Sequence, residues 1–233
     1  MLSPRPYPLI DEAGRPVAPP KRERNAVETK RRLLDAAEAE FAAKGFAGAR
    51  LGNIARVAQV QQALIHHYFS DKSGLYREVI DRALAAMTAE GFDILARLAR
   101  PLDATKIHPL VDAFVDLLMR FYVSHGAILA ILRHEGATGE STGGSIAEAM
   151  ISARVKPVFD AVVQAMDDLR AMGKIRADVN PRQLCVSALA MTSITIVEEP
   201  FIRGVWPVDF RSPEFIEERK REIVATVLGR LRL

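Results

Sequence analysis

GFAGARLGNIARVAQVQQALIHHYFSDKSGLY, residues 45–76, contains two short helical segments separated by a tight break. The first is predicted over 51–58 and the second over 61–67. Two helices joined in this way can pack roughly at right angles where small or apolar side chains meet between them. The residues that fit this contact are Ile54, Ala55, Ala58, Val60, Ile65 and Phe69.

The second of these helices keeps a polar or small-residue edge free of that contact. An edge of this kind can enter the major groove of DNA, where a glutamine side chain can form two hydrogen bonds with adenine. Lys72 is placed to meet a phosphate, as is the positive N-terminal end of the first helix. The pattern predicts a helix-turn-helix over about 49–68 that binds double-stranded DNA. The edge consists of Gln61, Gln62, Ala63, His66 and His67.

The segments before and after this stretch also have helical signals. Asn25 and Glu28 have the form of a capping box, which predicts a helix from Ala26. Lys44-Gly45 is a typical end for that helix, because glycine adopts a left-handed conformation at little cost. Asp71 is a candidate cap for a further helix over about 73–98, which Pro101 would end.

The remaining two thirds of the chain also predict helices, with a glycine-rich loop, GATGESTGGS, over 136–145. Asn180-Pro181 and Ser212-Pro213 each read as an N-cap followed by proline in the first helical position. No convincing strand alternation occurs, so the predicted fold is all-α. The predicted helices cover 109–133, a segment ending near Val155, 157–173, 181–199 with a stop at Pro200, and 213–231 with Ile216, Ile223, Val227 and Leu231 on one face.

The charge of the chain is unevenly distributed. The formal net charge of the 233 residues is +3. From Lys21 to Arg77, eleven Lys and Arg oppose six Asp and Glu, which gives +5 for this segment and leaves −2 for the rest. A basic first quarter on a neutral-to-acidic body indicates a polyanionic partner for that quarter.

The composition also argues against several kinds of site. Cys185 is the sole cysteine, so an intrachain disulfide and a cysteine-based zinc site are excluded. Its apolar helical context favours a buried, inert thiol. His66 and His67 are adjacent on a helix and point about 100° apart, so they do not readily share a metal ion. We therefore expect no metal, no cofactor and no catalytic residue.

The sequence has neither a membrane-spanning run nor a secretory signal. A spanning helix needs about 18 consecutive apolar residues, and no run in this chain reaches that length. Residues 1–20 are proline-rich and lack an apolar core segment. We expect a cytoplasmic protein with no membrane partner, and we expect its residues 1–24 to form a disordered tail.

The N-terminal pattern resembles that of the TetR family, the tetracycline-repressor-like regulators. The resemblance covers about 50 residues and is fairly specific, whereas the rest of the chain agrees only in the layout of its helices. The matching residues, at the family's spacings, are Phe41, Gly45, Phe46, Ile54, Ala55, Ala58, Val60, Ile65, Phe69, Lys72, Leu75 and Tyr76.

The resemblance implies roles for individual residues. His66, His67 and Tyr68 fall where the family has residues that touch backbone and bases, and Lys72 falls on the phosphate-contacting lysine. Gln61, Gln62 and Ala63 fall on the start of the recognition helix. The chain departs from the family pattern at four positions. They are Ala49 in place of the usual threonine cap with Arg50 beside it as a candidate phosphate contact, Gln59 in place of the turn glycine, Gln61 in place of the serine cap, and Leu64 in place of the family's frequent threonine or asparagine.

The sequence therefore predicts a homodimeric repressor that a small-molecule effector releases from a palindromic operator. A DNA-binding domain is predicted over 27–87 and a helical effector and dimerisation domain over 88–233. By resemblance, helices 181–199 and 213–231 of two subunits form a four-helix interface, with the face from Ile216 to Leu231 in it. The alternatives are a helical small-molecule-binding protein or enzyme with incidental basic helices, and a nucleoid-type architectural protein. Candidate residues for the effector pocket are Phe114, Phe121, His125 and His134.

Overall fold

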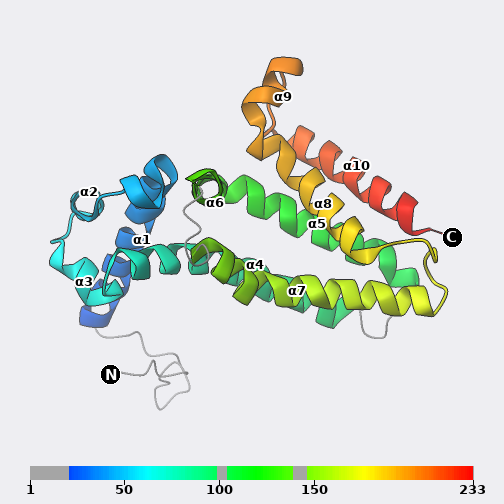
Figure 1. Cartoon of the computed structure of the whole chain (residues 1–233), viewed down its shortest axis with the longest axis horizontal. Coiled ribbons are helices and arrows are strands. Elements are labelled where there is room, and N and C mark those ends of the chain that lie inside the picture. The colour runs from blue at the N-terminus through cyan, green and yellow to red at the C-terminus, as the bar shows by residue number, and fades with distance from the viewer. Residues whose placement is uncertain (1–20, 99–103, 139–145, 233) are drawn as a thin grey trace, which may run out of the picture.

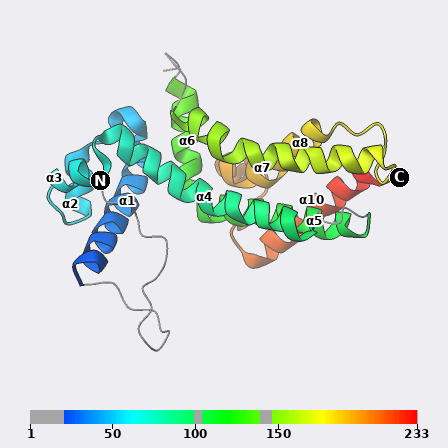
Figure 2. The same ribbon diagram turned by 90° about the horizontal axis from the view of Figure 1, so that it is seen from below.

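The computed structural model describes residues 21–98, 104–138 and 146–232, and every regular element in these ranges is helical. This confirms the predicted all-α class. α1–α3 and the start of α4 form one end of an elongated molecule, and α5 and α7–α10 form the other (Figures 1 and 2). α4 runs from the first end into the second, and α6 lies at the junction. The elements are α1 (Lys21–Gly48), α2 (Leu51–Val57), α3 (Ala63–Phe69), α4 (Lys72–Leu98), a 3-10 turn (Ala104–Lys106), α5 (Ile107–Ser124), α6 (Gly126–Thr138), α7 (Ile146–Ala171), α8 (Pro181–Val197), α9 (Glu199–Val205) and α10 (Pro213–Leu231).

α1 begins at Lys21, earlier than the capping-box pattern predicts. That prediction is wrong because Asn25 lies inside the helix, where its carbonyl accepts a hydrogen bond from the Thr29 hydroxyl at 2.7 Å. The last residues of the predicted tail are therefore helical, and residues 1–20 lie outside the described part of the chain. Gly45 interrupts α1 with a φ of 66°, which is the left-handed conformation expected of a glycine at a helix end.

The two helices of the helix-turn-helix occur, but the second begins later than predicted. α2 matches its predicted range to within one residue, whereas α3 starts at Ala63 rather than Gln61. The turn is longer because Gln59 adopts a φ of 56°, and the Val60 amide donates to the Ala55 carbonyl at 3.0 Å. The absence of the turn glycine is thus tolerated at some cost in backbone strain.

α4 connects the helix-turn-helix to the rest of the molecule. The Gly74 amide donates to the Asp71 carboxylate at 2.7 Å, which confirms Asp71 as the cap. Further along, Gly91 is buried where α4 crosses α7, and a Cβ at this position would lie only 2.9 Å from a methyl group of Val158. This close approach requires glycine. Pro101 lies outside the described residues.

The predicted single helix over 109–133 is wrong, because the chain bends by 79° between α5 and α6. His125 adopts a non-helical conformation at the bend, and its ring stacks on Phe121 with the ring centroids 4.8 Å apart. α6 continues to Thr138, so the start of the predicted glycine-rich loop is helical, and residues 139–145 lie outside the described part.

α7 is continuous where the sequence predicts two helices. Pro157 lies inside it on the exposed side and removes a single backbone donor. Contacts with α4 on both sides of the proline hold the helix together: Arg154 pairs with Asp81 at 2.6 Å, and Val158 packs at Gly91. α8 ends at Val197, before the predicted stop at Pro200, and Pro200 lies in the first turn of α9.

The two predicted proline-containing starts are confirmed. The Asn180 side chain accepts from the Gln183 amide, and the Ser212 hydroxyl accepts from the Phe215 amide. No single helix in the described ranges is both long and apolar enough to cross a membrane, although the bent pairs α5–α6 and α8–α9 reach that length and composition together.

The buried side chains form two main clusters. The first joins α1–α4 to the end of α5, α6 and the start of α7, so Phe121, Ile128 and Ile131 pack with the core of the helix-turn-helix. The second fills the space between α5, α7, α8 and α10. The α10 face with Ile223, Val227 and Leu231 belongs to this second cluster. Its prediction as an intersubunit face is therefore wrong, because these side chains are already buried inside the subunit.

Candidate nucleic-acid interface

α2 and α3 each bury one face in the first cluster and present the other face to solvent. Ile54 and Ile65 are fully buried, and Val60 packs partly buried against the same cluster. The residues predicted to be apolar and buried thus lie in one common cluster. The other buried members are Ala55, Ala58 and Phe69.

The N-terminus of α2 is capped by a side chain from α1. Ala49 has no hydroxyl, and Arg50 makes no side-chain cap. Instead the buried Glu40 carboxylate accepts hydrogen bonds from the Arg50 amide at 3.3 Å and from the Asn53 side chain. Lys44 also donates to it at 2.8 Å. The N-terminal end of α2, predicted to meet a phosphate, is thus already paired with a carboxylate.

The pKa of Glu40 lies below its usual range. The hydrogen bond from Lys44 is the main cause, the bonds from Asn53 and Arg50 add to it, and burial opposes it. Glu40 is not recognisable as a site residue from the sequence, because the contact joins residues in different helices. The missing threonine at Ala49 is the available signal that another cap is needed.

We expect Glu40→Gln to lower the free energy of unfolding by about 1–2 kcal/mol at neutral pH, the usual value of a helix cap. Because the folded-state pKa is depressed, the stabilisation is present above the unfolded-state pKa and is lost as the pH falls through the folded-state value. Urea unfolding at a series of pH values should show the two proteins converging in acid. A difference that stays constant with pH would contradict this role.

The predicted edge of α3 is exposed, with differences among its residues. Gln61, Gln62, Ala63, His66 and His67 are exposed, and Tyr68 is half-buried. Gln62 is the N-cap residue, and its side-chain oxygen lies 3.3 Å from where a Cβ on Gly52 would be. Gln62 therefore lies against α2, and Gln61 precedes it in the turn.

The two histidines have defined positions. His66 Nδ1 lies 3.0 Å from the Ser70 carbonyl oxygen, which fixes the ring at the end of α3. The His67 ring contacts Tyr68 edge to face, with the ring centroids 5.1 Å apart. Each ring therefore keeps one side available to a partner.

The cationic side chains around α3 differ in their exposure and in their contacts within the protein. Lys72 donates to the Ala47 carbonyl at 3.2 Å and lies 4.9 Å from the centre of the Phe46 ring, and burial lowers its pKa. Arg50 is exposed at the N-cap of α2. Arg56, which has no counterpart among the predicted site residues, is exposed on α2 and donates to Asn53 at 2.7 Å. Lys72 retains donor capacity, because an ammonium has three protons.

The four effector-pocket candidates do not gather at one place. Phe114 lines a small apolar cavity between α5, α7, α8 and α10. Phe121 and His125 lie at the other end of α5, against the cluster shared with the helix-turn-helix. The His134 side chain lies outside the described part of the structure.

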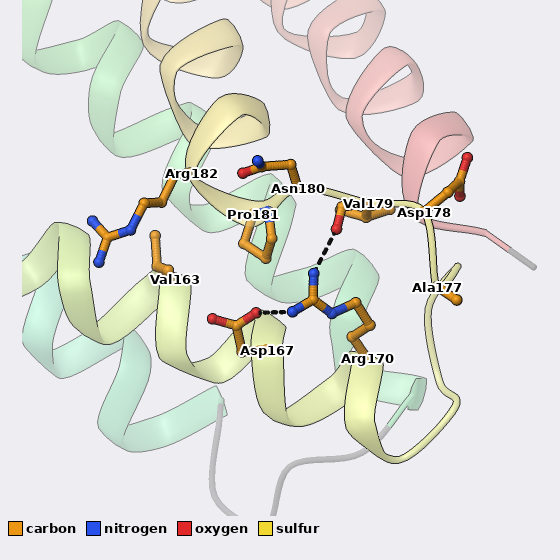
Figure 3. A pocket seen from close by; sticks show the side chains of 9 residues that line it. All are labelled: Val163, Asp167, Arg170, Ala177, Asp178, Val179, Asn180, Pro181 and Arg182. Atoms are coloured by element: carbon orange, nitrogen blue, oxygen red, sulfur yellow. Dashed lines mark hydrogen bonds and ion pairs between the residues drawn. The ribbon is translucent and has the colours of Figure 1, made fainter.

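A more open hollow of about 300 Å³ occurs where α7 turns into α8 (Figure 3). Arg170 points across it, donating to the Val179 carbonyl at 2.8 Å and to Asp167 at 2.6 Å. Arg182 pairs with Asp160 at 3.2 Å. Both guanidinium groups thus have partners within the protein, and we assign the hollow no ligand. Among the described residues, no group of three or more His, Cys, Asp or Glu could hold a metal ion.

Two family models match the chain. One, described as "Bacterial regulatory proteins, tetR family", matches residues 33–79. The other, described as "Tetracyclin repressor-like, C-terminal domain", matches residues 109–227, more than half of the chain. The chain belongs to the TetR family. The first match contains all of α2 and α3, and the second contains most of α5–α10.

Individual relatives are transcriptional regulators. The HTH-type transcriptional repressor SCO4008 of Streptomyces coelicolor is 30% identical over 113 residues, which are 48% of this chain and 52% of that protein. The repressor NicS of Pseudomonas putida is 27% identical over 49% of this chain and 51% of its own length. The match thus spans about half the length of both relatives. The solved structure of the ketosteroid transcriptional regulator KstR2 of Mycobacterium tuberculosis is similar over 88% of this chain and 95% of that protein's chain. The TM-score is 0.65 at 18% sequence identity, so the two proteins share the fold.

Proposed function

We propose that this TetR-family chain is a sequence-specific DNA-binding repressor and that α3 is its recognition helix. The observation that carries the proposal is the division of α3 into a buried back, Ile65 and Phe69, and an exposed edge that begins with Gln61 in the preceding turn and includes His66. The edge can reach base atoms while the back is fixed to α2 and α4. Arg50 and Lys72 flank the edge and are suited to contact phosphates. The chain then acts in the cytoplasm, where its DNA partner is.

A binding experiment tests this proposal directly. A pool of duplexes with a random centre is selected with the wild-type chain, and the selected duplex is used in mobility-shift titrations. Alanine replacement of Gln61, Gln62, His66 and His67 together should weaken binding at least about 100-fold, because each good base contact contributes about 1–3 kcal/mol. Full binding by this variant would exclude α3 as the recognition helix.

Lys72→Ala serves as the comparison within that experiment. It should weaken binding to selected and unselected duplexes alike and reduce the slope of log affinity against log salt by about one. Arg97→Ala, which removes an exposed cation at the far end of α4, should leave both quantities unchanged. Such a contrast separates phosphate contact from a general effect of charge.

We also propose that the protein is a homodimer, which binds a palindromic operator by two-fold symmetry. α8 and α10 lie side by side, and the faces they turn away from the subunit core are candidates for the contact (Figure 1). These faces carry small and apolar residues that let helices approach closely. They are Val186, Ser187, Ala190 and Ile194 on α8, and Ala225, Thr226 and Gly229 on α10.

A small-molecule effector is the proposed means of release. The shared apolar cluster supports this, because α5, α6 and α7 contribute side chains to the core beneath the helix-turn-helix. A ligand in the C-terminal part acts only through its different affinity for the DNA-bound and released arrangements. We propose no catalytic role, since the named relatives are transcriptional regulators.

A further inference from the structure

An apolar cavity of about 90 Å³ lies between α5, α7, α8 and α10. Phe114 and Leu118 of α5, Met166 of α7, and Cys185 and Ala188 of α8 are among its walls. Every lining residue in the described part of the chain is apolar or, at Cys185, a thiol. The space is thus unlike the polar hollow beside Arg170, where charged groups face the solvent.

The apolar walls of the cavity disfavour a charged ligand. An ionised group inside such a space would lose its hydration and find no counterion, which costs far more than apolar contacts return. The state of Cys185 agrees with this environment, because burial raises the pKa of its thiol to about 11. An uncharged apolar molecule, by contrast, gains from leaving water.

The size of the cavity limits the occupant. A void of about 150 Å³ holds a benzene molecule, so a single ring needs more room than the cavity now offers. The Met166 sulfur lies 4.0 Å from that of Cys185, and a methionine side chain adapts readily to a new neighbour. Movement of Met166 would provide the missing space.

One wall of the cavity also contacts the helix that carries the helix-turn-helix. A ring carbon of Phe114 lies 3.7 Å from the position that a Cβ on Gly91 would take. Gly91 belongs to α4, at its close crossing with Val158 of α7. An occupant that displaces Phe114 would therefore press on α4.

We propose that this cavity binds an uncharged, apolar small molecule about the size of one aromatic ring or a short hydrocarbon chain. The claim that this cavity is the effector site rests on the proposed function. The binding of the small molecule to the cavity does not depend on DNA.

Cys185 provides a direct measure of occupancy, because it is the sole cysteine and lies in the wall. The full chain is treated with methyl methanethiosulfonate, a small neutral thiol reagent, and its modification is followed by intact mass. Toluene at about ten times its Kd should slow the reaction about tenfold and raise Tm by about 3 °C or more. Benzoate has the same ring with a carboxylate in place of the methyl group, and it should do neither.

Variants of the lining residues test whether toluene binds in this cavity. Ala188→Leu fills the cavity and should abolish both responses to toluene, whereas Ala96→Leu, on the exposed side of α4, should keep them. Cys185→Ser preserves the size of the side chain and adds a hydroxyl to the wall, so the Tm shift with toluene should fall. This variant keeps the test open if Ala188→Leu does not fold.

The outcomes separate the cavity from the proposed function. Equal protection by benzoate, or no protection by toluene in a folded chain, would overturn the cavity proposal even where duplex binding is intact. Toluene binding that survives Ala188→Leu would place the site elsewhere and overturn it too. Toluene binding that leaves the affinity for the selected duplex unchanged would support the cavity and refute its role as the effector site.

Discussion

Gly74→Ala should abolish duplex binding and lower the free energy of unfolding by about 3 kcal/mol or more, at the upper end of overpacking effects. A Cβ at Gly74 would lie 2.0 Å from the Phe69 carbonyl oxygen and 3.2 Å from its carbon. These are backbone atoms at the end of α3, so no side-chain rotation can relieve the overlap. Either α3 or the first turn of α4 must move, and with it the predicted recognition edge.

The measurement pairs urea unfolding, followed by circular dichroism, with mobility shifts on the selected duplex. Gly126→Ala is the matched control, because a Cβ there meets nothing within 4 Å. It should leave duplex binding at the wild-type value. Wild-type stability and binding in Gly74→Ala would show that the junction between α3 and α4 has more room than the structure indicates.

The parts of this fold that the sequence predicts correctly are those set by local spacing. Ile54 and Ala58 are four residues apart, as are Ile65 and Phe69, and burial of one face of each helical segment follows from that spacing. The caps at Asp71, Asn180 and Ser212 are equally local, since each side chain bonds an amide three residues on.

The parts that the sequence does not predict depend on contacts between distant residues. Pro157 would end an isolated helix, but α7 continues through it because α4 supports both sides. The apolar face of α10 looks the same in sequence whether α5 or a second subunit covers it, and here it lies within the subunit. An apolar stripe indicates that a face is covered and does not identify the helix that covers it.

The candidate site divides in the same way. Exposure of His66 follows from the helical period, which also places Ile65 inside. The pairing of Glu40 with the start of α2 needs α1 and α2 to be brought together first. Local pattern therefore locates the interface, and tertiary structure decides which of its charges are already neutralised.

Phe41→Ala should lower the free energy of unfolding by about 3–5 kcal/mol, the usual cost of removing a buried aromatic ring. Phe41 is fully buried at the centre of the first cluster. Its ring meets Tyr76 edge to face, with the ring centroids 4.9 Å apart, and stacks with Phe46 at 6.3 Å. These three rings join α1, the turn after Gly45, and α4, so the cavity left by alanine would loosen all three elements together.

Phe92→Ala is the matched control, because Phe92 lies on α4 with 45% of its surface exposed. Truncating it should cost under about 1 kcal/mol, as is usual for exposed positions. Amide hydrogen exchange shows which helices Phe41→Ala loosens. Protection should fall in α1–α4 and in α6, because Ile128 and Ile131 of α6 share the same cluster. Loosening confined to α1–α4 would show that α6 is not coupled to the helix-turn-helix through this core, and the proposed route from effector to DNA would then have to run through α4 alone.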